Sequence, residues 1–297
     1  MSGEPWDCVI VGGGAAGLTA ALYLGRYRRR ALVLDAGKSR LLRIPRSHNL
    51  PGFPEGIEGA ELLRRLRRQA SQVGVPLEEA RVDTLVQERD GFTVRAASRT
   101  WRARFVLLAT GACDVEPQLP GLAAALQAGQ VRYCPICDGY ETQGQRVAVL
   151  GRGLHGLREA RFVAGFGNTV TWLSLQTQQD VASPELARLR EAGVRIAENV
   201  PVRIRCSKEA GVQVQMGNGE MLHFDALYPA LGLVHASGLA TRLGARAQED
   251  GQLEVDAHME TSVPHLYAAG DVAVDLNQIS VAAGHAAIAA TAIHNRL

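Results

Sequence analysis

Two cysteines separated by two residues form the most reactive group in the sequence. Cys134 and Cys137 enclose Pro135 and Ile136, and Asp138 follows directly. Cysteines at this spacing can close a disulfide, and a helix that starts at the second cysteine favours its thiolate. The carboxyl group of Asp138 is placed to move a proton as thiol and thiolate interconvert. The group therefore favours redox chemistry.

A zinc site is the competing interpretation of the same pair. A structural zinc ion takes four ligands, which usually come from two such pairs. The other three of the five cysteines, Cys8, Cys113 and Cys206, stand apart from one another and are expected to be structural thiols. Because a second pair is missing from the sequence, redox chemistry is favoured over zinc and no metal site is expected.

A glycine-rich segment near the start of the chain has the pattern of a dinucleotide-binding turn. The apolar run 7–11 predicts a buried parallel strand. Gly12, Gly14 and Gly17 then stand where the chain must turn tightly, approach a pyrophosphate and pack a helix on the strand. The N–H groups at the start of that helix would face the phosphates.

The residues that follow complete a strand–helix–strand unit. A small-residue helix is predicted over 18–29 and a second strand over 31–34. Asp35 closes that strand, 23 residues after Gly12, where an acid can bind a ribose hydroxyl.

A second unit of the same kind begins at residue 146. Its parts are a strand over 146–150, the glycines Gly151, Gly153 and Gly156, a helix over 157–166 and a strand over 169–173. The same 23-residue count from Gly151 leads to Ser174, and no Lys or Arg stands between Arg161 and Arg188. A bound 2′-phosphate needs an arginine near Ser174. The unit is thus a possible second dinucleotide site, at Gly151, Gly153, Gly156 and Ser174, or a retained fold whose site is altered or empty.

Two further apolar strands end in small-residue turns. The strand 105–108 runs into Thr110 and Gly111, and the strand 266–268 runs into Gly270 and Asp271 before an alanine-rich segment. The expected fold is α/β with two Rossmann-like nucleotide-binding domains. The first domain is discontinuous, and the cysteine-bearing domain is inserted in it. The expected boundaries are 1–114 with 241–297 for the first domain and 115–240 for the second.

Length and composition exclude several classes of protein. At 297 residues, 46% apolar and 21% charged, the chain has the profile of a soluble globular protein of about two domains. A net charge of +2 does not provide the basic face that nucleic-acid binding needs. The sequence contains no apolar run of the roughly 18 to 20 residues that a membrane helix requires. Its first residues do not resemble a secretion signal. A cytoplasmic protein is expected.

The chain resembles the low-molecular-weight thioredoxin reductases over nearly its whole length. The blocks that carry the resemblance are 11–17, 49–53, 109–112, 134–139 and 261–264 with 270–271. In that family the disulfide lies just before the strand of the pyridine-nucleotide domain, as Cys134 and Cys137 do here. The resemblance implies an FAD-dependent enzyme that forms a homodimer. It also implies a middle domain that rotates to present the disulfide to the flavin or to the substrate.

The resemblance also implies roles for individual residues. FAD would bind at Gly12, Gly14, Ala15, Ala16, Gly17, Asp35, Ala36, Asn49, Val82, Thr110, Gly111, Gly270, Asp271, Gln278 and Ile279. In that set the glycines would hold the pyrophosphate, Asp35 the adenosine ribose and Asp271 the ribitol chain. Cys137 would exchange electrons with the flavin, Cys134 would attack the outside disulfide, and Asp138 would serve as acid and base.

The sequence departs from the family at the second glycine turn. NADPH-using members carry a His-Arg-Arg-type run where this chain has the segment 174–180, and Arg152 and His155 replace small residues. The electron donor is therefore NADPH, NADH, ferredoxin or a second flavin. The leading activity is reduction of a thioredoxin-like protein. One alternative is a dithiol oxidase that uses oxygen and acts on a small dithiol, and another is a non-catalytic flavin redox sensor.

Overall fold

The chain forms two compact units, each built from separate segments of the sequence. The computed structural model describes residues 4–175, 183–207 and 211–297. The first unit comprises Met1–Leu42, Glu58–Cys113 and Val234–Leu297, and the second comprises Arg43–Ile57 and Asp114–Leu233. The second unit is therefore inserted in the first.

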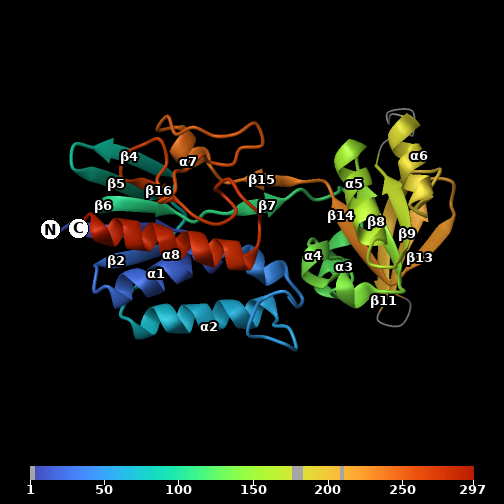
Figure 1. The fold of residues 1–297 in the computed structure, drawn as a ribbon, viewed down its shortest axis with the longest axis horizontal. Helices are drawn as coiled ribbons and strands as arrows, with labels where there is room; N and C mark the ends of the chain where they lie inside the picture. Colours follow the sequence, from blue (N-terminus) through green and yellow to red (C-terminus); the bar gives the residue numbers. More distant parts are fainter. Residues whose placement is uncertain (1–3, 176–182, 208–210) are drawn as a thin grey trace. The chain divides into compact units, whose positions relative to one another are not determined.

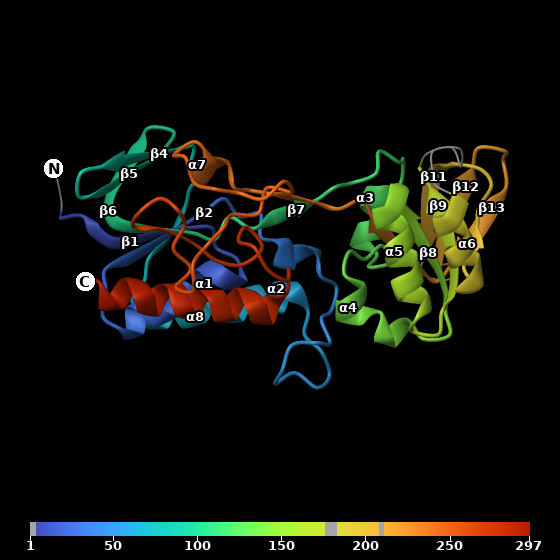
Figure 2. The ribbon, with the colours of Figure 1, turned by 45° about the horizontal axis from the view of Figure 1, so that its top comes forward.

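The first unit is a mostly parallel sheet with helices packed on it (Figure 1). Its sheet has the order β3-β2-β1-β6-β5-β4, and β16 pairs in parallel with β6. Its elements are β1 (Trp6–Val11), α1 (Ala15–Arg26), β2 (Ala31–Asp35), α2 (Gly59–Gln72), β3 (Leu77–Glu79), β4 (Thr84–Glu88), β5 (Gly91–Ala96), β6 (Arg99–Leu108), α7 (Gly238–Thr241), β16 (Leu266–Ala268) and α8 (Ile279–Asn295). Figures 1 and 2 show α1 and α8 side by side, although they come from opposite ends of the sequence.

Continuous burial along β1 shows that the first sheet is covered on both faces. In β1 every residue from Cys8 to Val11 is buried. Val9 and Val11 belong to a core with residues of β4, β5 and β6, and successive strand residues point to opposite faces. Strands buried on both sides read as continuous apolar runs, which is the pattern expected over 7–11. The predicted first strand–helix–strand unit is confirmed.

The second unit contains a smaller parallel sheet of the order β10-β9-β8-β14 and a three-stranded antiparallel sheet of the order β11-β12-β13. Its elements are α3 (Leu122–Gln127), α4 (Pro135–Asp138), the 3-10 turn η2 (Tyr140–Thr142), β8 (Arg146–Gly151), α5 (Gly153–Ala164), β9 (Thr169–Ser174), α6 (Ser183–Glu191), β10 (Arg195–Ile196), β11 (Pro201–Ser207), β12 (Gly211–Met216), β13 (Met221–Phe224) and β14 (Ala226–Ala230). The chain passes between the units through β7 (Ala112–Asp114) and β15 (Leu233–His235), which pair with each other.

Two cores lie on the two faces of the smaller sheet. Val147 and Val149 of β8 pack with residues of α5 and α6, whereas Ala148 and Leu150 pack with α3 and the antiparallel sheet. The strands predicted over 146–150 and 169–173 are confirmed. The expected α/β architecture of two Rossmann-like units is therefore observed. Among the described helices, none has both the length and the apolar character to cross a membrane.

Candidate active site

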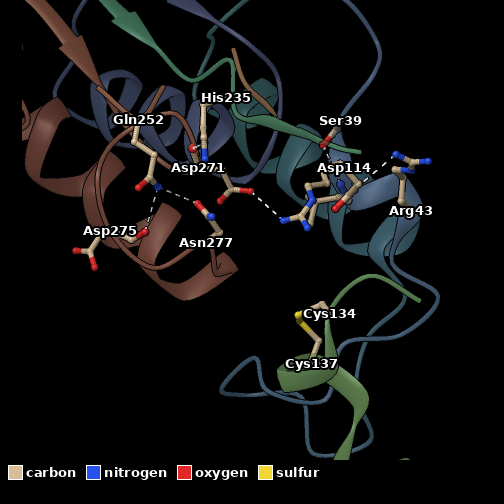
Figure 3. Close-up of polar contacts among 12 residues, drawn as sticks. Ser39, Arg43, Asp114, Cys134, Cys137, His235, Gln252, Asp271, Asp275 and Asn277 are labelled. Atoms are coloured by element: carbon tan, nitrogen blue, oxygen red, sulfur yellow. Dashed lines mark hydrogen bonds and ion pairs between the residues drawn. A yellow bond between two sulfur atoms is a disulfide. The ribbon is translucent and has the colours of Figure 1, made fainter. Parts of the chain in front are cut away.

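The two cysteines expected to be redox-active are joined by a disulfide (Figure 3). Their Cα atoms lie 5.3 Å apart, and the amide N–H of Cys137 donates to the carbonyl of Cys134 at 2.9 Å. Cys137 is buried and Cys134 is half-buried. The disulfide implied by the resemblance is confirmed. Because each sulfur atom is bonded to the other, the zinc interpretation loses its ligands.

The three remaining cysteines occupy different surroundings. Cys8 is fully buried in β1, and burial raises the pKa of its thiol well above the ordinary range. Cys113 is exposed, so packing does not explain its presence, and Cys206 is half-buried. Within the parts of the chain that the structure describes, no group of three His, Cys, Asp or Glu side chains is arranged to hold a metal ion.

Asp138 is a buried carboxyl at the end of the disulfide helix. The hydroxyl group of Tyr228 donates to its Oδ1 at 2.7 Å, and the Arg132 guanidinium lies 3.6 Å from its Oδ2. Burial raises the pKa of Asp138, and the hydrogen bond from Tyr228 and the charge of Arg132 oppose that rise without cancelling it. A carboxyl group with a raised pKa keeps its proton to a higher pH than usual, so that proton is available for donation to a thiolate.

The disulfide turn is also contacted by the segment 43–57, which belongs to the second unit. The backbone N–H of His48 donates to the carbonyl of Cys137 at 3.0 Å. The His48 imidazole Nδ1 lies 3.5 Å from a carboxylate oxygen of Glu141. The sequence predicted neither the contact of His48 with the disulfide turn nor its pairing with Glu141. It also did not predict that Tyr228 contacts Asp138, because residues 90 positions apart leave no local signal of their contact.

The first glycine turn is shaped by close backbone contacts. Gly12 has a φ of 114°, and a side chain there would overlap the carbonyl of Ala109. A side chain at Gly17 would overlap the carbonyl of Gly12 where α1 packs on β1. A Cβ at Gly14 would meet only the Ser39 hydroxyl, at 3.4 Å, and no side chain caps the first turn of α1. The turn therefore fits the pyrophosphate of FAD, because there is room beside Gly14 and no side chain caps the N–H groups of the first helical turn.

Asp35 lies at the end of β2 beside this turn. Its Oδ1 accepts the N–H of Gly37 at 3.0 Å, and its Oδ2 accepts a bond from Arg67 at 2.8 Å. A side chain at Gly13 would overlap the Asp35 carboxylate. The close approach holds the carboxylate next to the glycine turn, as a ribose-binding acid requires. The partner Arg67 was not expected from the sequence.

Asp271 also has partners that the sequence did not predict. The Arg40 guanidinium lies 3.2 Å from its Oδ2, and the ring of His235 bonds to its backbone carbonyl at 2.6 Å (Figure 3). Gly270, with a φ of 75°, brings the chain against Ala16 at the start of α1. The glycine turn and the segment before α8 therefore meet.

The first unit holds most of the residues expected to bind FAD. They are Gly12, Gly14, Ala15, Ala16, Gly17, Asp35, Ala36, Val82, Thr110, Gly111, Gly270, Asp271, Gln278 and Ile279. Thr110 donates its hydroxyl to the carbonyl of Ala236 at 2.8 Å, and Gln278 is the residue before the first turn of α8. Asn49 lies instead on the segment 43–57 of the second unit, where the Ser47 hydroxyl donates to its side-chain oxygen at 2.9 Å.

The second glycine turn is tightly built. Gly151 and Gly156 approach so closely that a side chain on either would overlap the other's backbone. Trp172 lies beneath them, and its buried indole N–H has no hydrogen-bond partner among the described residues. Ser174 is buried at the end of β9. Residues 176–180 of the segment expected to differ from NADPH-using members lie outside the described residues.

The chain is similar to known proteins over nearly its whole length. The chain matches the pyridine nucleotide-disulphide oxidoreductase family over residues 6–286. It is 31% identical to a thioredoxin reductase from Treponema pallidum over 97% of this chain and 95% of that protein. Among solved structures, a thioredoxin reductase from Streptococcus pyogenes superposes with a TM-score of 0.90 at 26% identity over 99% and 98% of the two chains. The structure of HlmI gives a TM-score of 0.89 at 26% identity over 100% and 94%.

Proposed function

Because the chain belongs to the pyridine nucleotide-disulphide oxidoreductase family, as a low-molecular-weight, FAD-dependent member like the thioredoxin reductases, we propose that it reduces a thioredoxin-like protein. Two electrons pass between FAD and the Cys134–Cys137 disulfide, and from there to the partner. The observation that carries this proposal is the Cys134–Cys137 disulfide. It forms in the second unit, directly before the buried carboxyl group of Asp138.

FAD supplies the two-electron chemistry when it is bound in the domain made of residues 1–114 and 241–297. The N–H groups at the start of α1 would hold its pyrophosphate, and Asp35 would bind the adenosine ribose. Asp271 would hold the ribitol chain, and Gln278 and Ile279, at the start of α8, would lie against the flavin. The domain 115–240 carries the disulfide.

The cysteines take separate roles in thiol–disulfide exchange. Reduction breaks the bond between Cys134 and Cys137 and adds two electrons and two protons, which gives two thiols. Cys134, the more accessible of the two, attacks the partner's disulfide as a thiolate and forms a mixed disulfide. Cys137 then breaks that bond and restores the internal disulfide. Asp138 accepts and returns the proton of the attacking thiol.

The electron donor is best tested directly. An anaerobic titration with NADPH and then NADH, followed by the flavin absorbance, measures whether the second domain still passes electrons from a nicotinamide. Stoichiometric bleaching at low concentration supports a pyridine-nucleotide donor despite Ser174. If only dithionite or a dithiol bleaches the flavin, the donor is ferredoxin, a second flavin or the dithiol itself.

Oxidation of a small dithiol with oxygen as the final acceptor is the second candidate function. Ser174 favours it, because the sequence at the ribose end of the second turn has neither the acid that binds NADH nor an arginine for the 2′-phosphate of NADPH. A dithiol that is consumed in air, with formation of hydrogen peroxide and without added nucleotide, supports this direction. A Cys134→Ser protein that loses turnover counts against a non-catalytic sensor. Light scattering of the purified protein tests the expected homodimer.

A further inference from the structure

The segment 43–57 is fixed to the second unit at several points. Arg43 pairs with Asp114 at 3.5 Å and with Glu116, and its guanidinium lies 4.9 Å from the centre of the Tyr133 ring. Ser47 and Ile57 close the segment on itself through backbone hydrogen bonds of 2.8 and 2.9 Å. The segment is therefore a fixed cover on this unit rather than a loose loop.

The cover places an imidazole beside the disulfide turn. The N–H of His48 bonds to the carbonyl of Cys137, and its Nδ1 lies 3.5 Å from Glu141, which follows α4 in η2. The His48 and Glu141 side chains are 27% and 34% exposed, so both exchange protons with water. Asp138, between Cys137 and η2, is buried.

Four charged or titratable groups face Asp138. Tyr228 comes from β14, Arg132 from the chain before α4, Glu141 from η2 and His48 from the cover. Tyr228 and Arg132 contact the carboxyl directly, and the other two act on it through their charges. His48 and Glu141 form a partly exposed pair, in which the imidazole is positive only when it is protonated.

We propose that His48 and Glu141 are a pair of positioning residues whose opposite charges adjust the proton affinity of Asp138 during thiol–disulfide exchange. The pair deepens the proposed function, because it acts on the proton carrier of the same reaction. Protonated His48 favours the Asp138 carboxylate, and Glu141 favours the protonated acid. An imidazole can carry the positive charge of such a pair and a carboxylate the negative one. The two charges therefore oppose each other at the moment when Asp138 gains or loses its proton.

The pair predicts shifts of opposite sign. The Asp138 pKa can be read by infrared spectroscopy from its protonated-carboxyl C=O band, which Asp138→Asn assigns by removing it. We expect Glu141→Gln to lower this pKa and His48→Gln to raise it, each by about half a unit. The double variant should titrate close to the starting protein. The Gln substitution at residue 48 retains the backbone N–H that bonds to the carbonyl of Cys137. It therefore tests the charge of the side chain and leaves this hydrogen bond in place.

A matched control removes one carboxylate elsewhere in the same unit. Glu220→Gln lies on the turn between β12 and β13 and should leave the Asp138 band unchanged. Shifts of the same sign in both test variants, or no shift in either, would overturn the proposal, because a purely structural role has no reason to produce opposite signs. The infrared measurement needs only the folded protein. Loss of thioredoxin reduction with retained opposite shifts therefore rejects the proposed partner, not the pair.

Discussion

Asp138 shows how one residue obtains a property that its own sequence position does not specify. Its carboxyl lies in the interior, and burial there penalises the charged form. The donor that partly compensates, Tyr228, is also buried, and its own pKa is raised by burial. The result is a carboxyl group whose protonated form is favoured, directly beside a cysteine of the redox pair.

A substitution at Asp138 should separate reactivity from stability. Asp138→Asn removes the proton carrier and should slow disulfide exchange by about a hundredfold or more. Because the folded-state pKa of Asp138 is raised, its contribution to folding is most favourable below the ordinary carboxyl range and is lost as pH rises through the raised pKa. The variant should therefore gain stability relative to the starting protein as pH rises from about 4 towards neutrality. Urea unfolding at a series of pH values measures this.

Asp225 supplies a control of opposite sign. The side chain of Arg146 lowers the pKa of Asp225 through a hydrogen bond at 2.8 Å. Its contribution to stability is therefore present above the ordinary carboxyl range and is lost as pH falls through the lowered pKa. Asp225→Asn should be less stable than the starting protein near neutrality, with a deficit that shrinks in acid. Parallel pH trends in the two variants would contradict one of the two assignments, and the sign of the common trend would show which.

At the scale of residues, the sequence identified the groups that react but not the groups that tune them. Cys134, Cys137 and Asp138 were recognisable because they are neighbours with a fixed spacing. Tyr228 reaches Asp138 from 90 positions away, and Arg132 is one of many arginines in the chain. Only the folded chain brings such partners together, so no local pattern distinguishes them.

At the scale of elements, the glycines of the first turn have different tasks. Gly17→Ala should disrupt the packing of α1 on β1, because its Cβ overlaps the backbone of Gly12. Gly14→Ala should leave the fold intact, since its Cβ meets only Ser39 at 3.4 Å, yet it should lower FAD content by narrowing the approach to the pyrophosphate. Circular dichroism and the ratio of flavin to protein absorbance distinguish the two effects.

Gly284 provides the matched control for these substitutions. It lies exposed in α8, and a Cβ there would meet no other atom within 4 Å. Gly284→Ala should raise the free energy of unfolding by about 1 kcal/mol through helix propensity and leave FAD content unchanged. Equal loss of FAD in Gly14→Ala and Gly284→Ala would argue against the proposed cradle.

Both strand–helix–strand units were predictable because their signals are local. A continuous apolar run, three glycines and a small-residue helix follow one another within about thirty residues, as in the segments that begin at Trp6 and Arg146. The helix starts were the least accurate part: α1 begins at Ala15 and α5 at Gly153, inside the glycine turns. The position of the segment 43–57 could not be predicted, because residues far away in the sequence hold it. Arg43 pairs with Asp114, and the N–H of His48 bonds to the carbonyl of Cys137.

At the scale of the whole molecule, FAD removal should affect one unit more than the other. FAD at a thousandfold excess over its dissociation constant should stabilise the unit that binds it by about 4 kcal/mol. Trp6 and Trp101 report on the first unit, and Trp172 reports on the second. Removal of FAD should lower the thermal midpoint seen by the first two and leave the Trp172 transition nearly unchanged. Single-tryptophan variants resolve the signals.

The Gly14→Ala protein serves as the reference for this experiment. Added FAD should raise the thermal midpoint of its first unit by less than in the starting protein. Equal movement of all three tryptophan signals on removal of FAD would show that the cofactor stabilises both units together, which would contradict the assignment of its site to the first unit.

The interruption of the first unit by the second imposes an order on biosynthesis. Every residue of the second unit leaves the ribosome before β16, which pairs with β6, and before α8, which packs on α1. Domains fold as units while the chain is being made. The disulfide-bearing unit can therefore fold on the nascent chain while the first sheet still lacks β16. A chain stalled when residue 240 has just left the ribosome should hold a folded disulfide-bearing unit and no flavin, because β16 and α8 have not yet joined the first unit.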